Sequence, residues 1–148
     1  MTEISFHFNA PDKLGHACRV LRKAVATGAK VVVTGDGALL RELDIALWTF
    51  SPLEFVPHCL GSASPPAVLA ASPVVLAESP RSAPHQHVLL NLGSAVPEGF
   101  ERFERLIEVV TVQEDDRHQA RRRWKHYADR GYAIKREDLA PKEARDAR

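Results

Sequence analysis

The segment Lys30-Val31-Val32-Val33-Thr34-Gly35-Asp36-Gly37 decides the fold that this sequence predicts. Its β-branched run is typical of a buried strand in a parallel sheet, and the Gly-Asp-Gly turn leads into a leucine-rich helix that Pro52 ends. Before it, residues 3–8 alternate like a strand, and residues 14–25 recur at helical spacing up to Gly28. Strand, helix, strand, helix is the order of an α/β protein with a mostly parallel sheet flanked by helices.

The second half of the chain continues this alternation. The sequence predicts a flexible surface loop over 61–72, short strands over 73–77 and 87–92 around a polar turn, a short helix opened by residues 97–100, a last strand over 106–112 and a helix over 114–130 stopped by Gly131. We expect residues 1–140 to form a single α/β domain and residues 141–148 to be a disordered charged tail.

Composition narrows the class of protein. The 148 residues are 45% hydrophobic, enough for a buried core, and the formal net charge of +1 argues against general coating of nucleic acid. Cys18 and Cys59 belong to no CxxC pair, so we expect buried or inert thiols in a reducing compartment. The sequence has neither a signal peptide pattern nor a membrane-spanning run, and we expect a cytoplasmic protein.

Positive charge is concentrated near the C-terminal end. The acid run 114–116 suits a helix N-terminus, and on that helix Arg117, Arg121 and Trp124 fall on one stripe at i, i+4 and i+7. Between Arg117 and Arg136 the only acid is Asp129. Two guanidiniums and an indole on one stripe predict a docking surface for an acidic, partly apolar ligand.

Motifs for catalysis are weak. The turn at Gly35 and Gly37 is similar to the start of a dinucleotide fingerprint, but Leu40 stands where the third glycine belongs, and a plain strand-to-helix turn is favoured. His85 and His87 lack the further ligands of a metal site. We therefore expect no enzyme activity, cofactor or metal, with a small α/β nucleotide or phosphoester hydrolase as the alternative.

Trp48 has two interpretations. Burial statistics favour a core aromatic. A tryptophan at a helix end, seven residues before Phe55, is equally typical of an exposed interface anchor.

Several of these stretches together resemble the chi subunit of the bacterial DNA polymerase III holoenzyme. The resemblance covers essentially the whole chain: residues 5–8, the helix end 43–48, the segment 55–58 and the basic helix around 121–127, of which the LDIALW and FVPH stretches are the most specific. It implies a Rossmann-like α/β fold without a nucleotide site, and a bacterial adaptor without chemistry of its own. It also implies two partners, the psi subunit and the acidic C-terminal tail of single-stranded DNA-binding protein, which ends in aspartates followed by Ile-Pro-Phe.

The resemblance assigns residues to both partners. The psi-facing tryptophan and phenylalanine match Trp48 and Phe55. Three tail-contacting side chains of the family match Arg117, Arg121 and Trp124, and a valine on the preceding strand corresponds to Val112 or Val110. Arg121 suits a carboxylate because a guanidinium offers two donors in a fixed fork. Direct binding of naked nucleic acid by the basic helix is a further alternative, which predicts strongly salt-dependent affinity for DNA.

Overall fold

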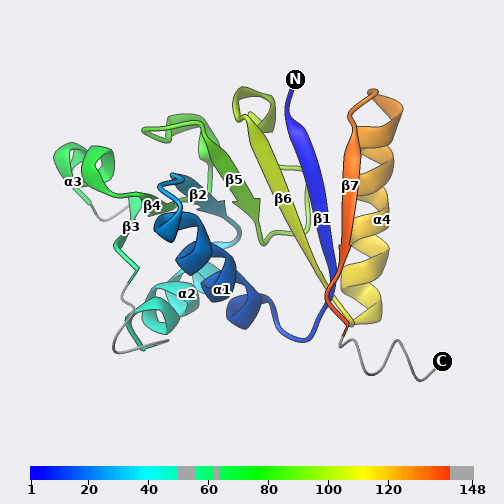
Figure 1. Cartoon of the computed structure of the whole chain (residues 1–148), viewed down its shortest axis with the longest axis horizontal. Helices are drawn as coiled ribbons and strands as arrows, with labels where there is room; N and C mark the ends of the chain where they lie inside the picture. Colours follow the sequence, from blue (N-terminus) through cyan, green and yellow to red (C-terminus); the bar gives the residue numbers. More distant parts are fainter. Residues whose placement is uncertain (50–55, 62–63, 141–148) are drawn as a thin grey trace.

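A seven-stranded sheet with the order β3-β4-β2-β5-β6-β1-β7 forms the centre of the molecule in the computed structural model, which describes residues 1–49, 56–61 and 64–140. Every pair of neighbouring strands is parallel. The prediction of an α/β fold with a mostly parallel sheet is therefore confirmed (Figure 1).

The elements follow one another in an α/β order. They are β1 (Glu3–Ala10), α1 (Lys13–Ala26), β2 (Val31–Thr34), α2 (Gly37–Thr49), β3 (His58–Leu60), α3 (Pro66–Ala71), β4 (Val74–Leu76), η2 (Pro80–Ser82), β5 (Val88–Asn91), η3 (Phe100–Arg102), β6 (Arg105–Thr111), α4 (Glu114–Asp129) and β7 (Ile134–Asp138). None of the helices in the described residues is long and apolar enough to cross a membrane.

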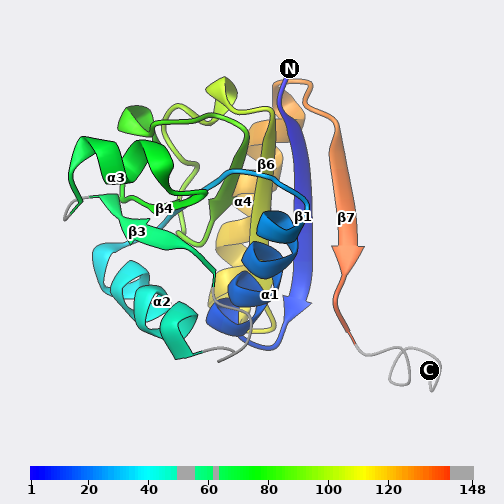
Figure 2. The ribbon, with the colours of Figure 1, turned by 60° about the vertical axis from the view of Figure 1, so that its left-hand side comes forward.

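The two faces of the sheet carry different helices. Helices α1 and α2 cover one face, and α4 covers the other (Figures 1 and 2). Alternate side chains of a strand point to opposite faces, so Val31 and Val33 pack with α1 and α2 whereas Val32 packs on the α4 side. In the same way Phe6 of β1 contributes to the core beneath α4.

Several sequence predictions were wrong. Residues 66–71 of the predicted loop form α3, which begins at Pro66, and proline is well tolerated in the first turn of a helix. The strand predicted over 106–112 is not the last, because β7 follows α4. The short strand β3 was not predicted. Residues 50–55 and the tail 141–148 lie outside the described residues.

The edge strand β7 was not predicted from the sequence, and the reason is physical. Its sequence Ile-Lys-Arg-Glu-Asp shows no apolar alternation, and its burial pattern is mostly exposed. Main-chain pairing with β1, in the register Ile4–Ile134 to Phe8–Asp138, holds it in the sheet. A charged strand at a sheet edge also resists unwanted pairing with other chains.

The prediction that both cysteines are buried thiols is confirmed. Cys18 on α1 and Cys59 on β3 are free and buried, and burial raises the pKa of the Cys18 thiol.

Candidate binding pocket beside helix α4

Helix α4 is oriented by a buried polar cluster centred on Glu108 of β6. Arg123 donates from Nε to Glu108 Oε1 at 3.0 Å, and the Tyr127 hydroxyl donates to Oε2 at 2.6 Å. The Asn91 amide donates to both carboxylate oxygens, at 3.0 and 3.1 Å. Because Arg123 and Tyr127 point into the protein, the stripe of Arg117, Arg121 and Trp124 is turned toward the strands β1 and β7.

The N-terminus of α4 is fixed as well. Asp116 Oδ2 accepts from the Thr111 amide at 2.7 Å and from its hydroxyl at 3.0 Å, and Asp116 Oδ1 lies 3.0 Å from Lys13 Nζ. These contacts tie the helix start to the end of β6 and to α1. The helix ends before Gly131, whose φ of 81° is one that glycine adopts without strain.

A pocket of about 420 Å³ lies between α4 and the sheet edge. Its lining residues come from β1, β6, α4 and β7: Phe6, Phe8, Val110, Arg117, Ala120, Arg121, Trp124 and Arg136. The three residues predicted on α4 thus line one pocket. Val110 lines it too, whereas Val112 is 51% exposed and is not among the lining residues.

The apolar part of the pocket is an aromatic wall. The rings of Trp124 and Phe6 lie 5.0 Å apart between centroids at an interplanar angle of 55°. Phe6 and Val110 are 3% and 5% exposed, so they are held by the core while Trp124 is only partly covered. A fixed wall of this kind can receive a ring or an aliphatic side chain without reorganising.

Arg136 is a lining residue that the sequence reasoning missed. Its Cζ atom lies 5.2 Å from the centroid of the Phe8 ring and 5.8 Å from that of Trp124, within the range of cation–π attraction. The guanidinium is therefore held beside the indole of α4. The signal that could have found it is the position of Arg136 on a strand paired with β1, which required β7 to be recognised.

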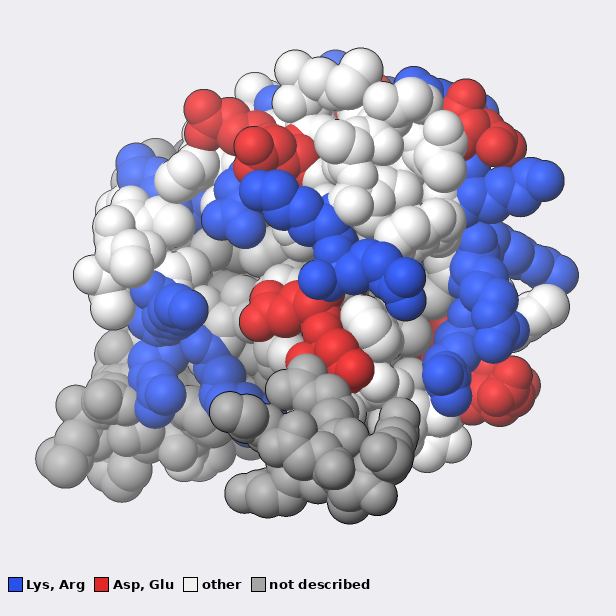
Figure 3. Space-filling model, turned by 45° about the vertical axis from the view of Figure 1, so that its right-hand side comes forward, with Lys and Arg blue, Asp and Glu red and all other residues white. Residues whose placement is uncertain are grey.

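Charge and apolar surface meet in this pocket. Arg117, Arg121 and Arg136 bring three guanidiniums to it. Arg121 Nη2 lies 3.8 Å from Glu114 Oε1, but the two side chains are 63% and 78% exposed, so this ion pair is weak and leaves the guanidinium available to a ligand. Over the face shown in Figure 3, Lys and Arg side chains gather in several separate groups, with acidic side chains beside some of them.

Trp48 lies far from this pocket, at the C-terminal end of α2. Its side chain is 62% exposed, next to Ile45 at 65%, so its interpretation as a core aromatic was wrong. The indole meets the ring of His58 edge-on at 5.5 Å between centroids, and His58 Nε2 lies 3.0 Å from Asp44 Oδ1. Phe55, the predicted companion of Trp48, lies outside the described residues.

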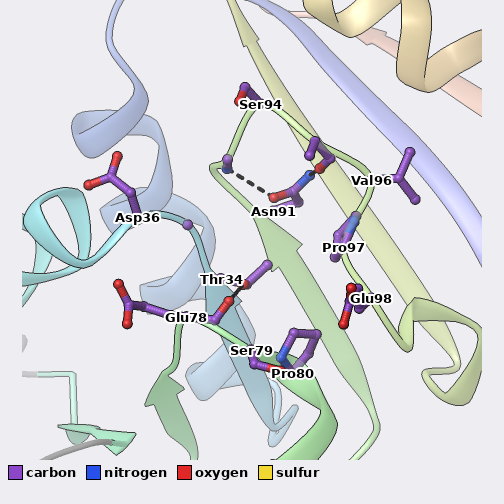
Figure 4. Close-up of a pocket in the computed structure, with 13 residues that line it drawn as sticks. Thr34, Asp36, Glu78, Ser79, Pro80, Asn91, Ser94, Val96, Pro97 and Glu98 are labelled. Atoms are coloured by element: carbon purple, nitrogen blue, oxygen red, sulfur yellow. Dashed lines mark hydrogen bonds between the residues drawn. The ribbon is translucent and has the colours of Figure 1, made fainter.

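A second pocket, of about 320 Å³, lies at the carboxyl ends of β2, β4 and β5, where nucleotide-binding folds hold phosphate (Figure 4). Here the N-terminus of α2 is already capped, because the Leu39 amide donates to Asp36 Oδ1 at 3.0 Å. Glu78 adds a second carboxylate, whose Oε1 would lie 2.6 Å from a Cβ placed on Gly37. Two carboxylates at this position disfavour a polyanionic nucleotide.

The histidines of the hydrolase alternative lie at the other end of the sheet. His87 immediately precedes β5, whereas Gly35 immediately follows β2, and the two strands are parallel with Val31 opposite Val88. At about 3.3 Å per residue, four paired residues separate these ends by more than 10 Å. The described residues also contain no group of three or more His, Cys, Asp or Glu side chains that could hold a metal ion.

The fold and the pocket define a parallel α/β protein with a basic, aromatic-walled pocket. A sequence model of the family described as DNA polymerase III chi subunit, HolC, matches residues 1–135. The chain therefore belongs to the DNA polymerase III chi subunit family. It is 30% identical over 139 residues to the DNA polymerase III subunit chi of Pseudomonas aeruginosa, covering 90% of this chain and 94% of that protein. It is 28% identical over 125 residues to the protein of the same name from Haemophilus influenzae, covering 83% and 85%.

Proposed function

We propose that this chain is a non-catalytic adaptor with two binding surfaces. The pocket beside α4, called the α4 pocket, binds the acidic C-terminal tail of single-stranded DNA-binding protein. The exposed side chains of Trp48 and Ile45, called the Trp48 surface, bind a psi subunit. Membership of the chi family supports a role in DNA replication. The observation that carries the proposal is the convergence of Arg117, Arg121 and Arg136 on a pocket walled by Trp124.

The pocket matches the tail in its chemistry. A tail that ends in aspartates and Ile-Pro-Phe presents a terminal carboxylate, neighbouring acidic groups and an aromatic ring. Arg121 can pair with the terminal carboxylate through two parallel hydrogen bonds. The phenylalanine ring would pack against Trp124 and Val110, and the remaining arginines would face the aspartates.

Affinity for one tail should be moderate. A short peptide loses its conformational freedom on binding, and exposed ion pairs contribute little each, so we expect a Kd on the order of micromolar. A tetramer of single-stranded DNA-binding protein carries several tails, and their high local concentration would strengthen attachment to coated DNA.

The Trp48 surface supports the second half of the proposal. An exposed tryptophan beside an exposed isoleucine is the kind of patch that anchors protein interfaces. It lies on α2, whereas the tail pocket lies on α4 at the opposite face of the sheet (Figure 2). Because the two surfaces share no residue, one chain can hold both partners at once.

Sequential binding tests the adaptor role. Single-stranded DNA immobilised on a sensor is coated with single-stranded DNA-binding protein, and this chain and then psi are passed over it. We expect psi to be retained only after this chain has bound. Coating with tail-deleted protein is the control and should retain neither. Retention of this chain on naked DNA, or equally on the tail-deleted protein, would contradict the proposal in favour of direct binding to nucleic acid or to the protein core.

A further inference from the structure

A third cleft lies on the face of the sheet opposite the α4 pocket. It has a volume of about 600 Å³ and runs between α1 and the strands β1, β6 and β7. Its floor is aliphatic and includes Val20 and Ala24 of α1 and Ile107 of β6. No residue of the α4 pocket lines it, because neighbouring residues of β1 and β7 point to opposite faces.

The rim of this cleft is basic. Arg19 and Lys23 lie one helical turn apart on α1, and Arg105 stands at the start of β6. All three are exposed, and none of them forms an ion pair with an acidic side chain of the described residues. Figure 3 shows Lys and Arg side chains around this hollow, with acidic side chains beside them.

Among the described lining residues the rim carries one acidic side chain, that of Glu137. Glu137 Oε2 lies 3.1 Å from His7 Nε2, and His7 Nδ1 lies 2.9 Å from His16 Nε2. Burial lowers the pKa of both imidazoles, that of His16 to about 4, so the two histidines are neutral at pH 7. Glu137 therefore offsets only part of the charge of Arg19, Lys23 and Arg105.

We propose that this cleft docks an acidic protein segment carrying aliphatic side chains. The aliphatic floor provides apolar contact, and the guanidiniums and ammonium of Arg19, Lys23 and Arg105 provide charge complementarity to carboxylates. Single-stranded nucleic acid would need aromatic platforms for its bases, and among the described residues that line the cleft there is no Phe, Tyr or Trp. The proposal is independent of the tail pocket, because the two sites share no residue.

An NMR titration of the full chain tests this site. The probe is the blocked peptide acetyl-Asp-Leu-Glu-Asp-Leu-Glu-Asp-amide, which has no terminal carboxylate for the α4 pocket. We expect saturable shifts at the amides of Val20 and Ile107, unaffected by a saturating single-stranded DNA-binding protein tail peptide. The double variant Arg19→Ala/Lys23→Ala should weaken binding about tenfold or more. The matched control Arg41→Ala/Lys125→Ala removes the same charge from exposed positions outside both pockets and should bind normally.

Two further probes make the outcome decisive. A peptide with serine in place of leucine should bind several-fold more weakly if the aliphatic floor takes part. The proposal is overturned if the two double variants bind alike, if the shifts appear at Trp124 instead, or if no saturable shift occurs. Tighter binding of a short oligothymidylate that is lost in Arg19→Ala/Lys23→Ala would overturn it in favour of a nucleic acid site.

Discussion

Arg123 and Glu108 form a buried ion pair, with 3.0 Å between Nε and Oε1 and side chains that are 2% and 0% exposed. Arg123 directly precedes Trp124, so the same pair that anchors α4 inside the protein also decides which way the indole faces. Ser94 extends the arrangement, because its carbonyl accepts from Arg123 Nη1 at 3.0 Å. The pocket geometry therefore depends on a side chain that takes no part in lining it.

Truncation of this arginine should damage the fold. Arg123→Ala leaves the Glu108 carboxylate buried beside fewer donors, and removal of one partner of a buried pair costs about 3–5 kcal/mol. Chemical denaturation should find that loss in the free energy of unfolding. Arg122→Ala, an exposed neighbour, is the control and should change stability by less than about 0.5 kcal/mol. Equal stability of the two variants would refute the role given to the buried pair.

Arg136 should contribute to tail binding through both charge and position. Arg136→Ala should weaken binding of a tail peptide by about 1 kcal/mol, and Arg136→Lys should recover part of the loss because it keeps the charge without the planar stack. Titration calorimetry measures both. Lys135→Ala, one residue earlier on β7 and outside the pocket lining, is the matched control. A loss as large in Lys135→Ala would mean that only general positive charge matters.

Because Trp48 is exposed, we expect its substitution to affect partner binding and not the stability of the fold. Trp48→Ala should cost less than about 1 kcal/mol of stability, because the side chain is 62% exposed, yet it should abolish psi binding. Tail binding should persist, since distant sites behave additively. A thermal melt of this variant measures its stability, and two binding assays measure its affinity for psi and for the tail peptide. Normal psi binding in the folded variant would remove Trp48 from the interface.

Stability should fall on mild acidification. The folded-state pKa of His16 is lowered to about 4 from an ordinary 6.5, first by burial and then by the charges of His7 and Arg19, against the opposing effect of Glu137. Below pH 6.5 the unfolded chain therefore binds a proton that the folded chain refuses, and stability decreases as the pH falls. From pH 7.5 to 5 the loss should be about 2 kcal/mol.

A substitution at His16 isolates the contribution of this residue to the pH dependence of stability. His16→Gln removes the titrating group, so its free energy of unfolding, measured by denaturation at both pH values, should fall less than that of wild type. The same pH dependence in variant and wild type would show that other groups, such as His7 or the carboxylates, account for the acid sensitivity.

The contrast between α4 and β7 explains how far the sequence could predict this protein. The Val31–Val33 run, the helix signals and the stripe of Arg117, Arg121 and Trp124 are local patterns, and each appears in the fold where the spacing places it. Arg136 was missed because β7 owes its place to main-chain pairing with β1, which leaves no apolar period in the sequence. Residue type would likewise place Arg123 of α4 and Glu108 of β6 at the surface, because charged side chains are rarely buried unless they are paired, and these two are paired with each other.

The exposure of Trp48 shows a second limit. Residue type favours burial for a tryptophan, and the apolar spacing of α2 assigns Leu40, Leu43 and Leu47 to the core without settling the next position. Only the packed sheet determines that this helix end projects beyond the core.

Titration calorimetry with a peptide ending in Asp-Asp-Ile-Pro-Phe tests the central claim, that the α4 pocket binds the tail through its terminal carboxylate. Wild type should bind with a Kd on the order of micromolar, and Arg121→Ala should weaken binding by about 1.5–3 kcal/mol. Arg122→Ala should bind normally, and a peptide with an amidated C-terminus should bind wild type weakly and lose little further in Arg121→Ala. Unchanged affinity in a folded Arg121→Ala, or equal affinity for the amidated peptide, would contradict the account.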